Sequence, residues 1–180
     1  MHLPIWLLGQ VPKEVCDIAV TEFEATAEID ATMGESGDII SHSHRNTSIR
    51  FANPDHWFGS ILYSHALKSN KDNQWNYNIT FHENLQYAKY GINQHYNWHV
   101  DIFPLSIKDY QRKITVVCLL NNPSEYEGGN LDIRLYQDYT VPLQKGTMVA
   151  FPSMLEHRVT PVLSGIRKSA TIWLNGNKST

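Results

Sequence analysis

The sequence lacks the features that mark disulfide-rich and redox proteins. Its two cysteines, Cys16 and Cys118, are too few for a disulfide framework and do not form a CxxC pair. We therefore expect them to be small buried residues, one in a helix and one in a strand. This usage is typical of a reducing compartment, and a cytoplasmic location is expected.

The sequence also lacks basic clusters and long hydrophobic runs. Fifteen Lys and Arg against 18 Asp and Glu give a formal net charge of −3, and the basic residues form no runs. A nucleic-acid partner is therefore not expected. The apolar run at residues 3–8 is too short to span a membrane, and it lacks the basic start and cleavage site of a signal peptide. No membrane partner is expected, and no pattern predicts an oligomeric state.

The first 74 of the 180 residues combine two helical patterns with short extended segments. The run at 3–8 predicts a strand. Apolar residues recur with helical spacing from Pro12 to Ala27 and from residue 55 to 68, which predicts two helices. Residues 34–43 are expected to form a loop and residues 45–51 an extended segment. We interpret residues 1–74 as the helical support of a single domain that covers residues 1–180.

From residue 75 onward the pattern changes to short strands. Trp75, Tyr77, Ile79 and Phe81 alternate with polar residues, which is typical of a half-buried strand. Further extended segments are predicted at 84–91, 96–101, 112–121, 130–135, 138–143, 146–151, 156–162 and 167–175. Many short strands without intervening helices favour a sandwich or barrel. We predict a mainly β fold with N-terminal helices and a double-stranded β-helix (jelly-roll) core at 75–175.

The pair His99-x-Asp101 is the first candidate site. Residues i and i+2 share one face of a strand, so the imidazole and the carboxylate would project side by side, about 6 to 7 Å apart along the backbone. His157 follows in a later strand. Two histidines and one carboxylate are typical of a non-haem Fe(II) oxygenase. By itself, however, a His-x-Asp pair is more often an ordinary surface pair.

Arg167, Ser169 and Thr171 alternate along the last predicted strand and therefore share a face. A guanidinium beside a hydroxyl inside a barrel binds carboxylates well. A dicarboxylate held there could chelate the iron with its other end, and 2-oxoglutarate has that form. The alternatives are an ordinary ion pair for Arg167 and competition from Lys168.

Together these residues resemble the 2-oxoglutarate- and Fe(II)-dependent oxygenases, and within them the prolyl 4-hydroxylase-like branch. The resemblance covers roughly residues 75–175. Its motifs are Tyr90 with Tyr96-x-x-His99-x-Asp101, Glu127-Gly128-Gly129-Asn130-Leu131, the stretch from Lys145 to Pro152, the stretch from His157 to Val162, Gly165-x-Arg167, and Trp173.

The resemblance implies a role for each matching residue. His99, Asp101 and His157 would ligate Fe(II), and Arg167 would bind the distal carboxylate of 2-oxoglutarate. Ser169 or Thr171 would assist Arg167, and Tyr90 would line the co-substrate pocket. Some relatives add a tyrosine on the strand after His-x-Asp. Here the run from Ile114 to Leu120 offers only Thr115 and Cys118 as non-aliphatic residues.

The resemblance also implies the reaction. A C–H bond would be hydroxylated with O2, succinate and CO2 would be co-products, and ascorbate could serve as reductant. Halogenating relatives lack the carboxylate ligand, so Asp101 favours hydroxylation. The first expectation for the substrate is a prolyl residue in a peptide or protein. Other side chains, free amino acids and small metabolites stay open, and loops near 34–47 and 102–111 are expected to contact the substrate.

Two other classes of function fit the same pattern. One is a non-catalytic jelly-roll module that binds metal or a partner, and the other is a cupin-like isomerase or hydrolase using Zn(II) or Mn(II) without O2. Among the remaining residues, His42 and His44 are expected in a solvent-exposed or substrate-contacting loop, and His95 at the rim. Three tryptophans are expected in the core: Trp57, Trp98 and Trp173.

Overall fold

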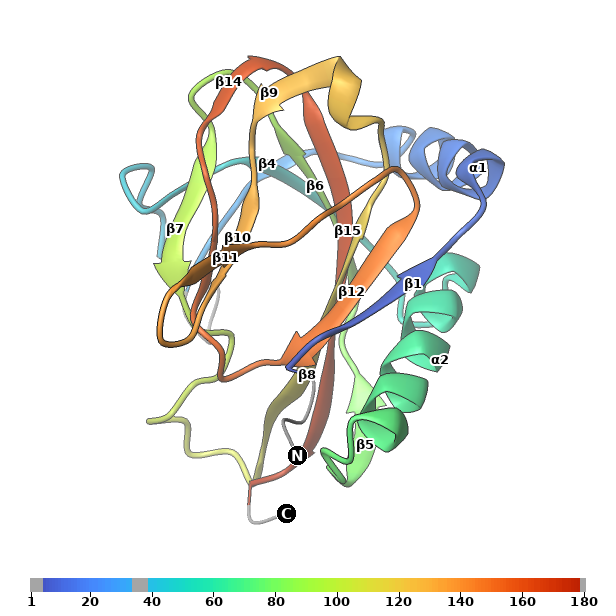
Figure 1. Cartoon of the computed structure of the whole chain (residues 1–180), viewed down its shortest axis with the longest axis vertical. Coiled ribbons are helices and arrows are strands. Elements are labelled where there is room, and N and C mark those ends of the chain that lie inside the picture. The colour runs from blue at the N-terminus through green and yellow to red at the C-terminus, as the bar shows by residue number, and fades with distance from the viewer. Residues whose placement is uncertain (1–4, 34–38, 179–180) are drawn as a thin grey trace.

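The computed structural model describes residues 5–33 and 39–178, so parts of the predicted strand at 3–8 and loop at 34–43 lie outside the described residues. Within these described ranges the fold is mainly β, with a larger and a smaller sheet that face each other and the helices α1 and α2 (Figure 1). The larger sheet contains, in spatial order, β1 (Leu7–Gln10), β12 (Thr147–Pro152), β8 (Tyr110–Leu119), β15 (Arg167–Asn177), β6 (Leu85–Tyr90), β4 (Ser48–Ala52) and β2 (Ile29–Asp30), with β5 (Ile79–His82) paired to β15.

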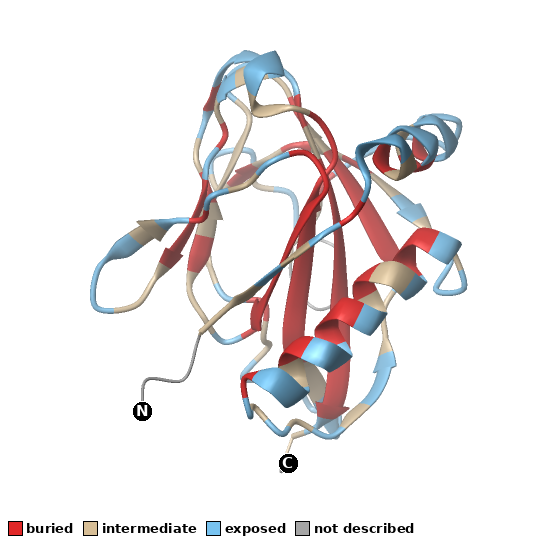
Figure 2. Ribbon diagram, turned by 45° about the vertical axis from the view of Figure 1, so that its right-hand side comes forward, coloured by how far each residue is buried: buried red, intermediate tan, exposed pale blue. Residues whose placement is uncertain are grey.

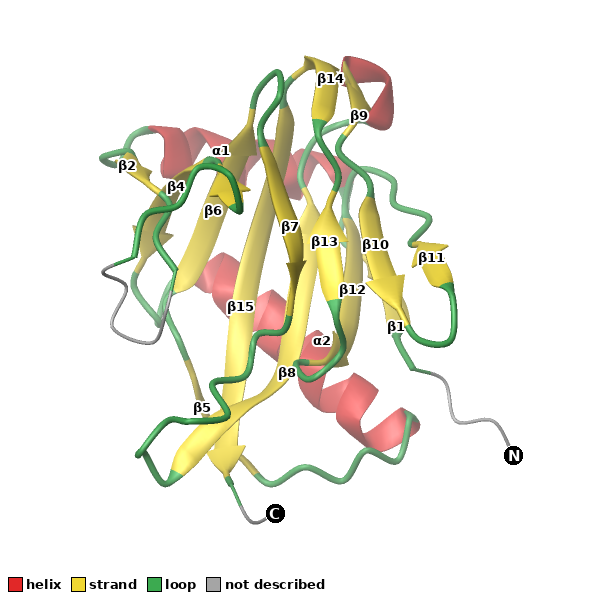
Figure 3. Cartoon of the chain, turned by 90° about the vertical axis from the view of Figure 1, so that its left-hand side faces the viewer, coloured by secondary structure: helices red, strands yellow, loops and turns green. Residues whose placement is uncertain are grey.

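The smaller sheet lies in front of the long strands β15, β8 and β12 (Figure 3). It contains β11 (Asp138–Thr140), β10 (Leu131–Arg134), β13 (His157–Val159), β7 (His95–His99) and β3 (Arg45–Asn46). The short 3-10 helix η1 (Pro123–Glu125) leads directly into β9 (Tyr126–Gly128). This strand pairs with β14 (Val162–Gly165), which comes later in the chain, to form a third, two-stranded sheet. This arrangement confirms the predicted jelly-roll.

Both helices cover the outer face of the larger sheet. In α2 (Trp57–Asp72), the buried residues Phe58, Leu62 and Ala66 recur every four residues and so share one face. The helix packs on β8, β12 and β15, and its buried side faces the sheet (Figure 2). Burying a side chain such as Phe58 or Leu62 contributes about 1.5 to 3 kcal/mol. A second hydrophobic cluster, which includes Phe151 and Ile133, fills the space between the two sheets. Within the described residues, neither helix has the length and apolar content that a membrane crossing requires.

Several element boundaries differ from the sequence predictions. The first strand covers residues 7–10, and α1 (Lys13–Glu24) ends before Ala27. Trp75 and Tyr77 pack on the core but do not belong to a strand. Gln74 and Asn76 each have a φ of 56°, and the Asn70 side chain binds both the backbone N–H and the carbonyl of Tyr77. These side-chain contacts fix a turn where alternation alone predicted a strand.

The cysteine predictions are confirmed and two tryptophan predictions are wrong. Cys16 and Cys118 are buried free thiols in α1 and β8. Trp57 is 38% exposed at the start of α2, and its Nε1 donates to Glu22. Trp98 lies on the smaller sheet between two guanidinium groups, of Arg134 at 3.8 Å and Arg158 at 4.6 Å from its ring centroid. The Trp57 indole therefore binds an acidic side chain and the Trp98 ring contacts two guanidinium groups, and neither ring fills the core. Trp173 is buried, as predicted.

Candidate metal centre

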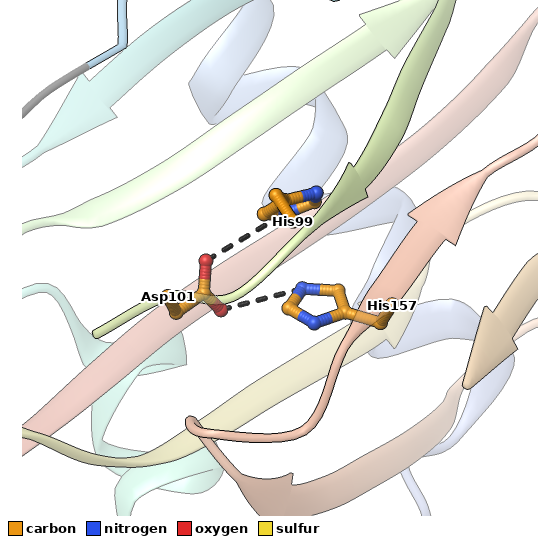
Figure 4. Close-up of side chains that lie close together, drawn as sticks. All are labelled: His99, Asp101 and His157. Carbon is orange, nitrogen blue, oxygen red and sulfur yellow. Dashed lines mark ion pairs between the residues drawn. The ribbon is translucent and has the colours of Figure 1, made fainter. Parts of the chain in front are cut away.

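His99, Asp101 and His157 converge between the two sheets (Figure 4). His99 ends β7 and His157 begins β13, and these antiparallel strands place the two histidines opposite each other. Asp101 lies just past the end of β7, where its backbone N–H donates to the Ser153 carbonyl. One potential ligand atom from each side chain lies within 4.8 Å of the others. Within the described ranges, this is the one cluster of three or more such side chains.

Hydrogen bonds orient both imidazoles. The Nδ1 of His99 lies 2.7 Å from the Asn97 carbonyl, and the Nδ1 of His157 lies 2.9 Å from the Leu155 carbonyl. Because a carbonyl only accepts, each Nδ1 must carry the proton. The Nε2 atoms then lie 3.6 Å and 3.4 Å from the two oxygens of Asp101. Both Nε2 atoms are therefore directed at the point where the carboxylate could share a metal ion.

The buried Asp101 carboxylate is held by hydroxyl groups as well. Thr115 Oγ1 donates to Asp101 Oδ2 over 2.7 Å, and Ser153 Oγ lies 2.9 Å from Thr115 Oγ1. A carboxylate only accepts, so the Thr115 proton is committed to Asp101 and Ser153 must donate to Thr115. This chain of hydrogen bonds runs from Ser153, just past the end of β12, through Thr115 of β8 to the carboxylate and fixes its orientation.

Electrostatics favour an ionised Asp101 and a neutral His99. Burial opposes ionisation of Asp101, but the charge and hydrogen bond of His157, followed by His99, hold the pKa of Asp101 well below its usual range. Burial, reinforced by the neighbouring His157, lowers the pKa of His99 to about 3. Burial opposes protonation of His157, but the charge and hydrogen bond of Asp101 raise the pKa of His157, so a divalent ion bound here would displace that proton. An ionised carboxylate beside neutral imidazole nitrogen fits a borderline divalent ion such as Fe(II).

Arg167 lies on the same cavity and is 1% exposed. Its Nη1 donates to Ser169 Oγ over 2.9 Å, whereas its Nε and Nη2 have no partner. Among the described residues it forms no ion pair. The predicted competitor Lys168 points to the opposite face, where it pairs with Glu24 of α1 at 2.9 Å. The orphaned N–H groups of Arg167 therefore fit a carboxylate brought by a ligand.

The other predicted co-substrate residues line this cavity too. Tyr90, Ser169 and Thr171 border it together with the three candidate metal ligands, and its empty volume is about 420 Å³ with its open mouth included. The ring centroid of Tyr90 lies 5.4 Å from the guanidinium carbon of Arg167. The structure thus brings all seven candidate residues to one cavity.

Sequence reasoning missed three neighbours of the site. Tyr96 stacks on His99 with ring centroids 3.5 Å apart, and Arg45 lies 4.6 Å from the centroid of the Tyr96 ring. Thr115 was noted only as a polar residue in an apolar run. Tyr96 stands three residues before His99 in the motif, which is a usable signal. Nothing local marks Arg45, because its place depends on the pairing of β3 with β7.

Three other histidines considered in the sequence, His42, His44 and His95, are not part of the cluster. His95 Nε2 lies 3.2 Å from the Ser43 carbonyl. The His44 ring meets the edge of Tyr96 at 5.8 Å, and His42 is exposed.

Comparison with known proteins identifies the family. The model of the 2OG-Fe(II) oxygenase superfamily matches residues 85–175. A PKHD-type hydroxylase of Xylella fastidiosa is 33% identical over 98 residues, covering 49% of this chain and 43% of that protein. A PKHD-type hydroxylase of Psychrobacter sp. is 34% identical over 93 residues, covering 49% and 36%. The matched region spans less than half the length of these curated relatives.

Solved structures share the fold across almost the whole chain. A viral collagen prolyl hydroxylase from Paramecium bursaria Chlorella virus-1, in complex with 2OG, has a TM-score of 0.76 at 18% identity, covering 96% of this chain and 97% of that one. A Pseudomonas putida prolyl-4-hydroxylase has a TM-score of 0.71 at 20% identity, covering 94% and 92%. A Trichoplax adhaerens prolyl hydroxylase, solved with a hypoxia inducible factor peptide fragment, has a TM-score of 0.75 at 15% identity, covering 97% and 84%. With the family model matching half of its length, this chain belongs to the 2OG-Fe(II) oxygenase superfamily.

Proposed function

We propose that this protein is a 2-oxoglutarate-dependent Fe(II) hydroxylase. One observation carries the proposal: the triad of His99, Asp101 and His157 shares a buried cavity with Arg167, which has two unpartnered N–H groups. A metal site and a carboxylate anchor in one cavity match a co-substrate that chelates the metal at one end and carries a carboxylate at the other.

Each side chain has a defined task in this proposal. His99, Asp101 and His157 would hold Fe(II) through two Nε2 atoms and a carboxylate oxygen. Arg167 would bind the distal carboxylate of 2-oxoglutarate, with Ser169 orienting the guanidinium through the bond that its hydroxyl accepts. Tyr90 and Thr171 would close the sides of the pocket. When bound, the iron and 2-oxoglutarate would supply the O2 activation that hydroxylates a C–H bond, with succinate and CO2 as co-products.

A prolyl residue in a peptide or protein is the substrate we propose first. Its support is the likeness in fold to prolyl hydroxylases, one of them solved with a peptide fragment. The same chemistry on another side chain, a free amino acid or a small metabolite is the alternative.

The test is turnover of 2-oxoglutarate to succinate by protein loaded with Fe(II), with O2 and ascorbate present and a library of proline peptides as substrates. We expect succinate formation to require Fe(II) and to be lost in His99→Ala and Asp101→Ala. Iron and 2-oxoglutarate binding that survives both substitutions would refute the assignment. Tight metal binding without succinate would instead support a binding module, and O2-independent activity with Zn(II) or Mn(II) would support a cupin-like isomerase or hydrolase.

A further inference from the structure

The cavity around the triad continues into a groove that the co-substrate residues do not reach. Arg45, Gln86, Tyr96, Asp101 and Trp173 line both the cavity and the groove, whereas Arg167 lines only the cavity. The groove also has apolar walls, which include Ile49, Phe51 and Phe103. This groove therefore offers a substrate a way to the triad that leaves the Arg167 end of the cavity to the co-substrate.

Most of the charge in the groove is already balanced. Arg112 pairs with Glu83 through two N–H groups at 2.7 Å and 2.5 Å, and its guanidinium carbon lies 4.1 Å from the ring centroid of Trp173. The Asp101 charge belongs to the metal site. The charges of these groups are therefore already paired and do not by themselves favour a charged ligand in the groove.

Arg45 is the exception. It is 7% exposed, and among the described residues it forms no ion pair. Its guanidinium donates to the Thr32 carbonyl over 2.9 Å and to Gln86 Oε1 over 3.1 Å, while its Nε–H has no partner. A buried cation without an anionic partner is costly, so a ligand that brings a negative charge would be strongly favoured here.

Trp173 adds a second free donor. Its indole Nε1–H is buried and unpartnered, and the residue lines the same groove as Arg45. A ligand seated here must therefore supply hydrogen-bond acceptors. A neutral carbonyl would satisfy one N–H but leave the Arg45 charge unmatched, whereas a carboxylate supplies two acceptor oxygens and the charge.

We propose that the primary substrate carries a carboxylate, which binds Arg45 and the indole N–H of Trp173 on the groove side of the metal site. This inference rests on the proposed function and narrows its substrate class. The carboxylate could belong to a free acid, such as an amino acid, or to an acidic side chain of a peptide, and the two sources are separated by the test below.

The test compares acids with their matched amides on protein loaded with Zn(II) and N-oxalylglycine, an analogue that occupies the Arg167 pocket. The pairs are acetate and acetamide, L-proline and L-prolinamide, and the blocked peptides acetyl-Gly-Pro-Glu-amide and acetyl-Gly-Pro-Gln-amide. Binding is followed by NMR of the 15N-labelled tryptophan indoles, with Trp173→Phe used to assign the Trp173 signal.

We expect at least one acid to bind roughly 10- to 100-fold more tightly than its amide and to shift the Trp173 signal. L-Proline as that acid would identify a free acid, and the Glu peptide would identify an acidic side chain. Equal binding of acids and amides in every pair would overturn the proposal.

Two variants test whether the guanidinium of Arg45 causes the preference for the acid. Arg45→Met keeps the length of the stem but removes the charge, so it should abolish the preference for the acid and leave N-oxalylglycine binding intact. Arg50→Met is the matched control, because Arg50 also lies over a tyrosine ring, Tyr87 at 5.7 Å, but lines neither the cavity nor the groove. Loss of N-oxalylglycine binding in folded Arg45→Met would overturn the proposal by assigning Arg45 to the co-substrate.

The acid and amide comparison on the unsubstituted protein needs no variant, so it decides the question even where Arg45→Met fails to fold. The same experiment distinguishes failure of the proposed function from failure of the proposed substrate carboxylate. Failure of N-oxalylglycine to bind would refute the proposed function, whereas normal N-oxalylglycine binding with no acid preference refutes only the carboxylate.

Discussion

Replacing Thr115 by valine tests whether the hydroxyl chain behind Asp101 sets metal affinity. Valine keeps the branched shape of threonine but removes the hydroxyl that donates to Asp101 Oδ2 over 2.7 Å. Thr115 is 1% exposed, so water cannot easily replace the lost donor. The carboxylate would lose both an orienting contact and a partner for a buried oxygen.

The expected magnitude follows from the charge of the acceptor. A hydrogen bond to a charged group contributes about 1.5 to 3 kcal/mol, which corresponds to roughly 10- to 100-fold in a dissociation constant. We therefore expect Thr115→Val to weaken Zn(II) or Mn(II) binding by that factor. Thr115→Ser keeps the hydroxyl and should retain most of the affinity.

The assay is competitive titration of the metal against a chelator, with unfolding by denaturant measured in parallel. Thr147→Val is the control, since Thr147 is also a buried threonine of the larger sheet, but its hydroxyl donates to Gln10 at 3.2 Å, away from the triad. It should lower the free energy of unfolding without changing metal affinity. Two results would refute a role of the Thr115 hydroxyl in metal binding. One is a metal affinity of Thr115→Val within twofold of that of the original protein, and the other is an equal loss of metal affinity in Thr115→Val and Thr147→Val.

Three further predictions concern the co-substrate, pH and the core. Arg167→Met should raise the KM for 2-oxoglutarate by roughly 10- to 100-fold, because the carboxylate loses a charged donor pair; an unchanged KM would reject this role. Burial lowers the pKa of His65 in the folded protein, and the hydrogen bond to the Leu7 carbonyl offsets this only in part. As the pH falls below about 6.5, the unfolded chain therefore binds a proton before the folded protein does, and the free energy of unfolding decreases. Melting between pH 7 and 5 should therefore show a shallower decline in stability in His65→Gln than in the original protein, and an equal decline in the two proteins would reject the role of His65. Phe58→Ala should lower the free energy of unfolding by about 3 to 5 kcal/mol, measured by denaturant titration, because the fully buried ring leaves a cavity in the core.

Much of the fold and the site could be predicted from local pattern. The strands from residue 84 onward were placed within a few residues, because their alternation and turn signals act over short distances. The same two-residue period placed His99 and Asp101 on one side of the chain, and Arg167, Ser169 and Thr171 on one face of β15. The alternation pattern did not predict the two short strands β9 and β14.

Failures occurred where specific side-chain contacts override the preference read from periodicity. Trp75 and Tyr77 alternate like strand residues, but hydrogen bonds from the Asn70 side chain to the Tyr77 backbone hold this segment out of a strand. Trp98 looks like a core aromatic in the sequence, yet two arginines from β10 and β13 cover it on the smaller sheet. The Asn70 contact spans only seven residues but depends on a specific side-chain hydrogen bond, whereas the Trp98 contacts join residues that no short window contains.

By itself, therefore, the sequence determined the jelly-roll class, because this class depends on short strands with a period of two. Residue type, the same short period and the family resemblance together proposed the triad and the anchor at Arg167. Only the tertiary structure decided that His157 lies opposite His99, that Thr115 and Ser153 hold Asp101, and that Arg45 is buried without an anion beside the site. These features depend on strand pairing across the two sheets, and strand pairing is set by burial of the whole core rather than by neighbours in the chain.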